Sequence, residues 1–495
     1  MNAISYYDVV IIGAGPAGLF AAYKIHRSDP DLKILIIEKG KSYEERYCPV
    51  REANEECRRC KNCELISGEG GAGLFSDGKM VFTLDTGTSI CFSPKKKRSV
   101  LDEIRKLLKQ FDGEFPDQRG PELTRLLNEQ KKFQKAGLTF DYFPVWHLGT
   151  FRLKRVMKNF LEYLHKQRNI NFMIGGEVVG IKNWSNPTKK RILIKCKNGS
   201  LRKINIITKN IIFAVGKEGS FLLARWLKKK GVKVRSNRCY FGMRLELPTK
   251  IFKELLEITP NPKIHKYYDG IHLKTHCFCQ NGQVLLLKYY GLPLAGGHTY
   301  ENNGFKTGVS KNSFSNFSVL LGKEITYPEI MEKSLQIMEK VNGLTKGYLL
   351  AQRMEDFLNK IPTSLAGKRT KTIARPGNIA ELYRDSYPFF VDFITRLNKV
   401  IPGITNKENW LYAPAVEWWM PEIELNDEME TSIKGIYVIG DASGKTQGII
   451  QSMASACLAA DSILNKIHHE KIKQKILPTG YDSSLQEHFG ESISS

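Results

Sequence analysis

A short apolar run ends in a Gly-x-Gly-x-x-Gly pattern at residues 13–18, and a helical pattern follows it directly. Gly13 allows the tight turn out of the strand, Gly15 lets the backbone approach a pyrophosphate, and Gly18 lets the helix pack closely on the strand. The helix N-terminus offers free N–H groups and a partial positive charge to phosphates. This segment predicts a strand–turn–helix unit that binds a dinucleotide.

A second apolar run, residues 34–37, is followed by Glu38. A carboxylate at this place in the unit accepts hydrogen bonds from the adenosine ribose hydroxyls. It also disfavours a 2′-phosphate, so FAD or NAD fits better than NADP. The alternative is a glycine-rich turn before an ordinary helix, which the strand, helix and acid in register make the weaker interpretation.

The chain has 495 residues, which is long for one hydrophobic core and indicates two or three domains. Hydrophobic residues make up 42% and charged residues 25%, as in ordinary globular enzymes. No apolar run approaches the roughly 18 to 20 residues that span a bilayer. The N-terminus shows no signal-peptide pattern, and a cytoplasmic location is expected.

The formal net charge is +24, from 75 Lys and Arg against 51 Asp and Glu. Such a charge favours nucleic acid, an anionic membrane surface or an acidic substrate, unless it reflects a lysine-rich proteome. The basic runs at residues 95–98, 189–191 and 228–230 are short and scattered, without interleaved aromatic residues. Nucleic-acid binding is therefore kept as an alternative only.

Further elements follow from periodicity. Helices are expected within residues 99–136 and over 150–167, the latter capped by Thr150. Short strands are expected at 170–174, 178–181, 191–196 and 204–207, with a hairpin turn at Asn198-Gly199. Residues 41–67 and the Gly-, Asn- and Tyr-rich residues 292–308 are expected to be loops, and a last helix is expected from Gly448 to Lys466.

The order of these elements predicts an α/β fold with a discontinuous Rossmann-like domain, because strands of the dinucleotide-binding type occur early, in the middle and late in the chain. Residues 1–40, 140–235 and 411–470 are expected to form that domain, and 236–410 an inserted mixed α+β substrate domain. Residues 41–139 are expected to hold a Cys-rich loop, a second Gly-rich motif and helices, and 471–495 a polar tail.

The late strand, which ends in Gly440-Asp441, makes this order similar to that of two-domain flavoproteins. The resemblance implies that Asp441 reaches the ribityl or pyrophosphate region of FAD and that the helix near Gly448 points its N-terminus at the flavin pyrimidine edge. It also implies that Ala214-Val215-Gly216 crosses near the FAD and that the strand at 177–179 holds the adenine.

A narrower resemblance covers residues 7 to 465. The chain resembles the bacterial family of uncharacterised FAD-dependent dehydrogenases, which implies a cofactor and a fold but no substrate. The stretch Gly70-Gly-Ala-Gly73-Leu-Phe-Ser76-Asp77-Gly78-Lys79 is its most specific part, whereas residues 291–308 depart from the family pattern. The resemblance also rests on Cys48-Pro49, the Cys57-x-x-Cys60-x-x-Cys63 run, His147-Leu-Gly149-Thr150, Cys277-Phe-Cys279, Ala351-Gln-Arg353-Met-Glu-Asp356-Phe357 and Gly440-Asp441-Ala-Ser-Gly444.

The expected cofactor site combines the glycine loops with these flavoprotein positions, and Lys79 is the candidate closest to the flavin chemistry. Asp77 and Lys79 follow the second Gly-rich run, so Lys79 could hold the flavin N1–C2=O region or an anionic substrate. The expected FAD-binding residues are Gly13, Gly15, Gly18, Glu38, Gly71, Gly73, Ser76, Val178, Ala214, Gly216, Gly440, Asp441, Gly448 and Ile449.

Four of the ten cysteines cluster, at Cys48, Cys57, Cys60 and Cys63. Converging thiolates of this spacing bind a [4Fe–4S] cluster or zinc, and nearby arginines (Arg46, Arg51, Arg58 and Arg59) would lower the thiol pKa values. A redox-active pair such as Cys60 and Cys63, or incidental loop cysteines, are the other interpretations. No metal is part of the main prediction.

Three weaker candidates complete the set. Cys277 and Cys279 would alternate on one strand face, either as a flavin-proximal dithiol or, more simply, as ordinary strand cysteines. His298 would lie exposed in a loop, where it is catalytic or merely solvated. The Glu417-Trp418-Trp419 run would line a pocket or pack in the core.

The sequence thus predicts an FAD-dependent oxidoreductase that transfers hydride through flavin N5 to or from a small organic substrate. No second unit of strand, Gly-x-Gly-x-x-Gly turn and helix is predicted, since the glycines at 68–73 follow an expected loop, so NAD(P)H is expected at most as a transient electron donor. Two alternatives stay open: an RNA-modifying flavoprotein, and a flavin-bearing redox-sensing module built on the cysteine loop.

Overall fold

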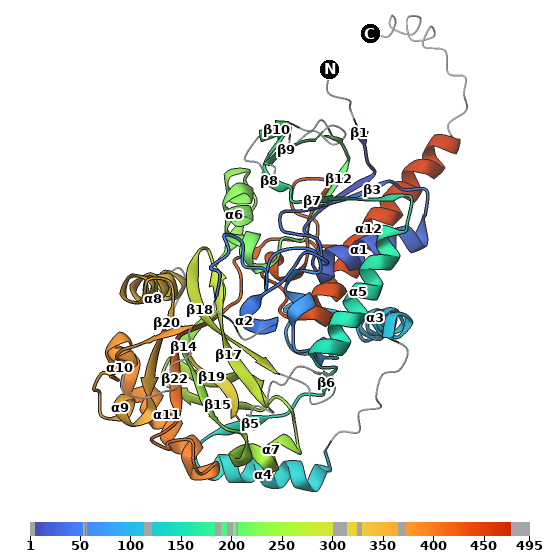
Figure 1. Ribbon diagram of the computed structural model, residues 1–495. Coiled ribbons are helices and arrows are strands. Elements are labelled where there is room, and N and C mark those ends of the chain that lie inside the picture. Colours follow the sequence, from blue (N-terminus) through green and yellow to red (C-terminus); the bar gives the residue numbers. More distant parts are fainter. Residues whose placement is uncertain are drawn as a thin grey trace, which may run out of the picture.

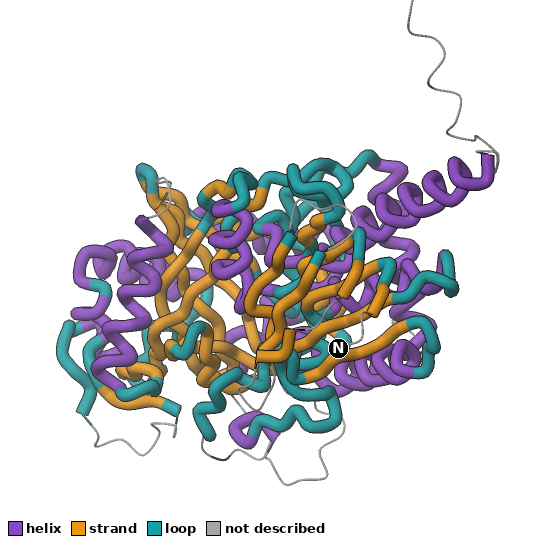
Figure 2. The backbone as a smooth tube through the Cα atoms, turned by 90° about the horizontal axis from the view of Figure 1, so that it is seen from above, coloured by secondary structure: helices purple, strands orange, loops and turns teal. Residues whose placement is uncertain are grey.

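Two sheets organise the protein (Figure 1), a five-stranded parallel sheet and an eight-stranded, largely antiparallel sheet. The computed structural model describes residues 5–52, 55, 57–112, 121–183, 190–195, 201–203, 206–299, 314–323, 329–364 and 373–476. In Figure 2, the strands run through the middle of the molecule and helices cover its outer sides.

The parallel sheet has the strand order β24-β12-β2-β3-β7. Its strands come from early, middle and late parts of the chain, so the domain is discontinuous, and the predicted α/β Rossmann-like fold class is confirmed. Strands β2, β3, β12 and β24 are fully buried, as parallel strands covered on both faces require, whereas only Ile170 is buried in the edge strand β7. Their bounds are Val9–Ile12 (β2), Ile34–Glu38 (β3), Ile170–Ile174 (β7), Asn210–Phe213 (β12) and Ile436–Val438 (β24).

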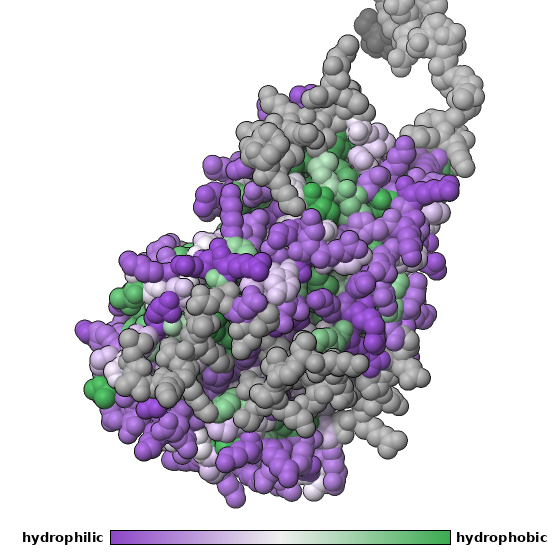
Figure 3. All heavy atoms as spheres, viewed as in Figure 1, coloured by the Kyte–Doolittle hydropathy of each residue, from purple (hydrophilic) through white to green (hydrophobic). Residues whose placement is uncertain are grey.

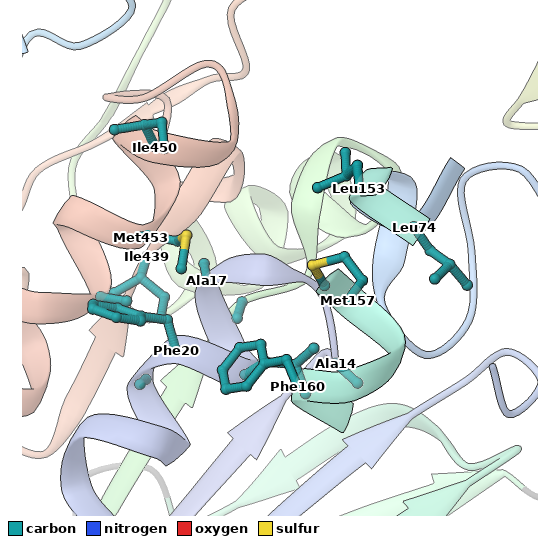
Figure 4. Packing of buried hydrophobic residues seen from close by; sticks show 14 of the residues in the cluster. Ala14, Ala17, Phe20, Leu74, Leu153, Met157, Phe160, Ile439, Ile450 and Met453 are labelled. Atoms are coloured by element: carbon teal, nitrogen blue, oxygen red, sulfur yellow. The ribbon is translucent and has the colours of Figure 1, made fainter. Parts of the chain in front are cut away.

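Helices α1 (Pro16–Ser28), α5 (Thr150–His165) and α12 (Ile449–Ile476) cover one side of this sheet. Figure 4 shows Phe20 of α1, Met453 of α12 and Phe160 of α5 converging in one buried cluster. Alanines on α1 and α12 are fully buried and let these two helices approach closely. The glycine loop before α1 is therefore held by a rigid core.

The larger sheet has the order β21-β20-β22-β14-β19-β16-β15-β5 and packs against helices α8 to α11. Its strands are β5 (Thr139–Asp141), β14 (Cys239–Pro248), β15 (Lys263–Tyr268), β16 (Ile271–Cys279), β19 (Phe314–Lys323), β20 (Leu349–Arg353), β21 (Ala374–Pro376) and β22 (Trp410–Trp418). The helices are α8 (Glu329–Thr345), α9 (Met354–Leu358), α10 (Ile379–Leu382) and α11 (Tyr387–Val400).

Smaller sheets and helices connect these two parts. The helices are α2 (Pro49–Glu52), α3 (Pro94–Asp112), α4 (Leu123–Lys135), α6 (Gly216–Lys229) and α7 (Lys253–Leu256), with 3-10 turns η1 (Gly71–Phe75), η2 (Thr249–Phe252), η3 (Arg384–Ser386) and η4 (Gly440–Ser443). The strands are β1 (Ser5–Tyr6), β4 (Lys79–Val81), β6 (Val145–His147), β8 (Glu177–Lys182), β9 (Arg191–Lys195), β10 (Leu201–Lys203), β11 (Ile206–Ile207), β13 (Val234–Arg235), β17 (Gly282–Tyr289), β18 (Leu292–Thr299) and β23 (Glu422–Ile423).

The structure corrects the predicted boundaries at several places. Strand β5 and strand β22 lie in the larger sheet, so that sheet takes residues from both flanks of the predicted 236–410 segment. Helix α12 extends ten residues beyond the predicted Lys466, into the expected polar tail. The added turns are mostly exposed, and His468 and Lys471 in them contact the Asp29 carboxylate at the end of α1. The Asn198-Gly199 turn lies outside the described residues.

Two local predictions were wrong. Residues 292–299 form strand β18, because eight residues of this segment pair with β17, whereas residues 300–308 lie outside the described part. Thr150 does not cap α5, since Gly149 is the N-cap residue. The Thr150 hydroxyl instead donates to the Thr299 carbonyl and contacts the His298 ring.

The visible surface in Figure 3 is predominantly hydrophilic over the described residues, with small separate apolar areas. In the same described part of the chain, no helix combines the length and apolarity needed to cross a membrane.

Candidate active site

A cavity of about 870 Å³ lies between the carboxyl ends of the parallel strands and one face of the larger sheet. One side of the cavity is lined by residues that follow β2, β3, β12 and β24. The other side is lined by residues of β15, β16 and β22. In open parallel sheets, ligands bind at this edge. The volume is that of a binding pocket rather than of a packing defect.

The two Gly-rich segments meet at the inner end of the cavity. Gly13 has a φ of +107°, and a Cβ added to it would lie 2.3 Å from the Ala214 carbonyl oxygen. A Cβ at Gly71 would lie 2.9 Å from the Gly15 Cα, and Gly70 donates its N–H to the Ala14 carbonyl at 2.8 Å. The second Gly-rich segment is therefore part of the same loop assembly as the first.

Other glycines leave room instead of filling it. A Cβ at Gly15 would have no neighbour closer than 3.9 Å, and one at Gly216 would meet nothing within 4 Å. Both residues line the cavity at the N-termini of α1 and α6, where backbone N–H groups lack helical partners. The N-terminus of α12 lines the cavity as well. This arrangement suits a ligand with negative phosphate oxygens.

Glu38 ends β3 with its side chain buried in the cavity wall. One carboxylate oxygen accepts the Ala14 N–H at 3.0 Å, and the other accepts the N–H groups of Gly40 (2.8 Å) and Gly68 (3.1 Å). The carboxylate thus ties both Gly-rich segments together. Contact with a ribose stays a prediction.

The structure brings almost all predicted FAD-binding residues to this one cavity. Gly18 is the exception: it packs α1 on the sheet, where a Cβ would lie 2.1 Å from the Gly13 carbonyl oxygen. Those that line the cavity are Gly13, Gly15, Glu38, Gly71, Gly73, Ser76, Val178, Ala214, Gly216, Gly440, Asp441, Gly448 and Ile449, together with Lys79.

Asp441 lies at the end of β24 beside the N-terminus of α12. Its carboxylate accepts a hydrogen bond from the Ser452 hydroxyl at 3.0 Å and lies 3.9 Å from the Lys217 ammonium. Burial raises the pKa of this carboxyl, against the effect of Lys217. The Asp441 carboxylate lines the cavity at this point.

Lys79 stands where the glycine loops meet the larger sheet. Its ammonium lies 2.6 Å from the Asp77 carboxylate and also donates to the Phe278 carbonyl. This ion pair keeps the pKa of Asp77 low and the pKa of Lys79 high, although burial opposes both shifts. Both groups are charged at neutral pH.

The wall of the cavity formed by the larger sheet carries two lysines, Lys263 of β15 and Lys274 of β16, which were not among the predicted site residues. We call this part of the wall the cationic lobe. Lys274 is paired with Glu417 at 2.7 Å, whereas Lys263 forms no ion pair with any residue that the structure describes. Burial lowers the pKa of Lys263 to about 8, and the Glu417 charge acts against this shift. The signal was present in the alternation of His272, Lys274 and His276 along one face of β16.

A chain of polar rings crosses the same lobe. The Tyr240 hydroxyl lies 3.1 Å from His272 Nδ1, and His272 Nε2 lies 2.9 Å from His265 Nδ1. His265 Nε2 in turn lies 3.4 Å from the half-exposed Asp141 carboxylate. Burial lowers the pKa of both histidines, to about 3 for His265 and about 4 for His272, so both rings are neutral at pH 7. Neutral rings in such a chain can pass a proton.

Two sequence candidates near the cavity are resolved by strand geometry. Glu417 and Trp419 line the cavity, whereas Trp418 turns into the core and donates its indole N–H to Ser334 at 2.9 Å. His298 was wrongly expected to be exposed. It lies in β18 with 2% of its surface exposed, 2.8 Å from the Thr150 hydroxyl.

The cysteine loop does not take the form of a metal centre. Cys48, Cys57, Cys60 and Cys63 line a second cavity of only about 20 Å³, room for about one water molecule. Within the residues that the structure describes, no group of three or more His, Cys, Asp or Glu side chains could hold a metal ion.

The thiol pKa values in this loop also differ from the prediction. Burial raises the pKa of Cys60 and of Cys63 instead of arginines lowering them. The arginine side chains have other partners: Arg46 binds the Glu64, Glu69 and Gly71 carbonyls, and Arg58 lies over the Tyr47 ring. An Fe–S or zinc centre is therefore not supported.

Known proteins resemble this chain in part. The model of the Thi4 family matches residues 1–44, the first glycine loop and Glu38. An uncharacterized protein of Clostridium beijerinckii is 24% identical over 92% of this chain and 80% of its own length. A thiamine thiazole synthase of Yarrowia lipolytica is 67% identical over 33 residues, which are 7% of this chain and 10% of that protein.

Among solved structures, the E. coli quinol fumarate reductase subunit is 12% identical and aligns over 96% of this chain and 74% of its own, with a TM-score of 0.39. These similarities are too distant or too short to transfer an activity.

Proposed function

We propose that this protein is an FAD-dependent oxidoreductase that acts on a small organic anion. The observation that carries the proposal is the continuity of the cavity: one end is built from glycine loops and helix N-termini, and the other from the polar face of a second sheet. A dinucleotide in the first part would present its reactive ring to a substrate in the second.

The residues present fit FAD. The open faces of Gly15 and Gly216 leave space where side chains would block a pyrophosphate, and Glu38 lies within the same wall for the adenosine ribose. Asp441 would hold the ribityl chain, the α12 N-terminus at Gly448 and Ile449 the pyrimidine edge, and the β8 backbone at Val178 the adenine. When bound, FAD supplies two-electron hydride transfer at N5.

The chain's own groups would orient the substrate and handle its proton. Lys79 reaches the junction of the two parts of the cavity, so it would hold either a flavin carbonyl or a substrate oxygen. The ring chain Tyr240–His272–His265 would carry a proton between the cavity and Asp141 at the surface.

The cationic lobe supports an anionic substrate. The paired charges Lys79–Asp77 and Lys274–Glu417 cancel locally, and Lys263 is left without an ion-pair partner among the described residues. A cation in a cavity wall is stabilised by an anionic ligand. Carboxylates and phosphates meet that requirement, and neutral hydrocarbons do not.

The test is cofactor release from the purified full-length protein. We expect a yellow protein whose denatured supernatant contains FAD at about one molecule per chain, and no flavin in a Glu38→Ala, Asp441→Ala double variant. Glu44→Ala, at an exposed carboxylate outside the cavity, should retain FAD. A colourless wild-type protein that takes up no FAD on reconstitution would overturn the proposal. The RNA-modifying and redox-sensing alternatives, and a transient NAD(P)H donor, stay predictions.

A further inference from the structure

Two thiols lie side by side at the boundary between Lys79 and the larger sheet. Cys277 Sγ and Cys279 Sγ are 4.0 Å apart near the end of β16. They were predicted to share a strand face by alternation, but a bulge brings them together: the pairing with β19 shifts between His276 and Cys279, and Cys277 has a φ of +51°. Cys277 lines the cavity, and Cys279 is fully buried behind it.

A buried guanidinium holds this pair. Arg244 of β14 is 2% exposed, and its Nη2 donates to the Cys277 carbonyl at 2.6 Å and lies 3.1 Å from Cys279 Sγ. Its other N–H groups donate to Asn316 Oδ1 at 2.6 Å and Ser318 Oγ at 3.1 Å. A Cβ at Gly297 would lie 1.8 Å from Nη2, so a glycine there makes room for the guanidinium.

The charges around the thiols require an anion. Arg244 forms no ion pair with any described residue, and the carboxylate of Asp77 is already paired with Lys79. Asp77 lies 3.9 Å from Cys279 Sγ. A buried cation without a counter-charge is costly. Arg244 contacts Cys279 Sγ, and Cys277 Sγ lies 4.0 Å from that sulfur, so one negative charge on the thiol pair offsets the guanidinium.

The acid–base properties agree with the geometry. The hydrogen bond from Cys279, together with Arg244 and Lys79, holds the pKa of Cys277 well below its usual range, although burial acts against this. Burial raises the pKa of Cys279, which keeps its proton. Cys277 also lines the cavity, whereas Cys279 is buried behind it, so Cys277 carries the sulfur that a reactant in the cavity can reach.

We propose that Cys277 and Cys279 are a redox-active thiolate–thiol pair that exchanges two electrons with the cofactor of the same cavity. In the oxidising direction, the S–S bond between Cys277 and Cys279 forms and the S–H bond of Cys279 breaks. Two electrons and that proton would be accepted by FAD when it is bound in the same cavity. This step rests on the proposed FAD function for its electron acceptor. It gives the protein a second redox centre, with thiols and disulfides as its class of reactants.

The first arm of the test needs no flavin. The full-length apoprotein is alkylated with iodoacetamide between pH 5.5 and 9, and each cysteine is followed by peptide mass spectrometry. We expect Cys277 to react at pH 6 at least about tenfold faster than the exposed Cys91, because only the thiolate reacts. Mild oxidation with oxidised glutathione should remove two hydrogen atoms from the peptide that contains Cys277 and Cys279.

The second arm uses the protein loaded with FAD. A thiolate close to an oxidised flavin gives a long-wavelength charge-transfer absorbance, which we expect in the wild type and in Cys239→Ser, a buried cysteine of β14 outside the cavity. The band should be absent in Cys277→Ser and should bleach on alkylation of Cys277. A Cys279→Ser variant should keep the band and lose the disulfide.

The outcomes separate the two proposals. If Cys277 alkylates in parallel with Cys91 and forms no disulfide with Cys279, the dithiol proposal is overturned whatever the flavin content. If the thiols behave as expected but the protein binds no flavin, the assignment of a thiolate–thiol pair is supported. Electron transfer from this pair to a flavin and the proposed FAD-dependent function are then both overturned. If flavin binds and no thiol-dependent band forms, electron exchange between the two centres is overturned.

Discussion

The Gly13 α-carbon faces the Ala214 carbonyl so closely that a Cβ on Gly13 would lie 2.3 Å from that oxygen. The two residues follow β2 and β12, which pair in parallel with Phe213 beside Ile12. The first and the middle dinucleotide motifs are thus one interlocked structure, although some 200 residues separate them in the chain.

Gly13→Ala should therefore destabilise the protein by about 3 kcal/mol or more, since the new methyl group meets backbone on the adjacent strand at a positive φ. Gly231→Ala is the matched control: its φ is +85°, but its Cβ meets nothing, so only the backbone strain of about 1 kcal/mol remains. Denaturant unfolding of both variants measures the difference. Equal losses of unfolding free energy in the two variants would contradict the close packing of Gly13 against Ala214.

Glu38→Gln should lower the unfolding free energy of the apoprotein by about 2 to 3 kcal/mol. The carboxylate accepts three backbone N–H bonds, and an amide NH2 group would face one of those donors. Unfolding with and without added FAD separates the structural loss from a loss of cofactor binding. Glu44→Gln, at an exposed site, should change neither the unfolding free energy nor FAD binding. A Glu38→Gln variant as stable as the wild type would contradict the assigned hydrogen bonds.

The buried His298 should make stability fall in acid. Burial, Arg51, Lys79 and His147 lower the pKa of His298 to about 3, against the effect of Asp77, so the folded protein holds this ring neutral. The unfolded chain binds the proton below about pH 6.5, so this stability is fully present above that pH and declines as the pH falls toward 3.

Between pH 6 and 4, His298→Gln should reduce the slope of the unfolding free energy against pH by about 1.4 kcal/mol per pH unit, because one proton fewer is taken up on unfolding. Unfolding free energies at four pH values measure it, with His469→Gln at an exposed position as control. An unchanged slope in the His298 variant would show that other groups carry the acid sensitivity.

Affinity for small anions should decline above pH 8. The pKa of Lys263 is about 8, in the presence of Glu417, Lys274, Cys277 and Lys79, so its positive charge disappears between pH 7 and 9. Titration of the FAD-loaded protein with malonate, benzoate and inorganic phosphate, followed by flavin absorbance, gives the dissociation constants.

Lys263→Met should raise the dissociation constant of the tightest-binding of these anions about tenfold at pH 7, which is about 1.4 kcal/mol. It should also abolish the pH dependence of that constant. Lys266→Met, on the same strand but outside the cavity lining, should change neither quantity. Anion binding that is equal in the Lys263 variant would place the substrate elsewhere in the cavity.

The parallel sheet was predictable because its strands carry local signals. The apolar runs at β2, β3, β12 and β24 are continuous and end in glycine or an acid, as buried parallel strands before a ligand-binding edge do. Strand β18 was not predictable in this way. Its glycines Gly296 and Gly297 indicate a loop. Gly297 leaves room for the guanidinium of Arg244, which comes from a strand far away in the sequence.

The candidate site divides along the same line. The glycine loops, Glu38 and Asp441 could be found because each motif fixes its own backbone geometry. The cationic lobe could not, since Lys263, Lys274 and Glu417 come from three strands whose order in the sheet is set by long-range pairing. The Arg244–Cys279 contact depends on a bulge and on a missing side chain elsewhere.

The sequence by itself determined the glycine loops and the discontinuous parallel sheet and led to the proposal of FAD, because glycine conformation and apolar periodicity act over a few residues. Only the tertiary structure decided that both Gly-rich segments form one cradle, that His298 is buried and neutral, and that two thiols share a buried guanidinium. Those properties depend on burial and on charges from separate strands, and a carboxyl, imidazole or thiol acquires them only when folding removes water and brings its neighbours into contact.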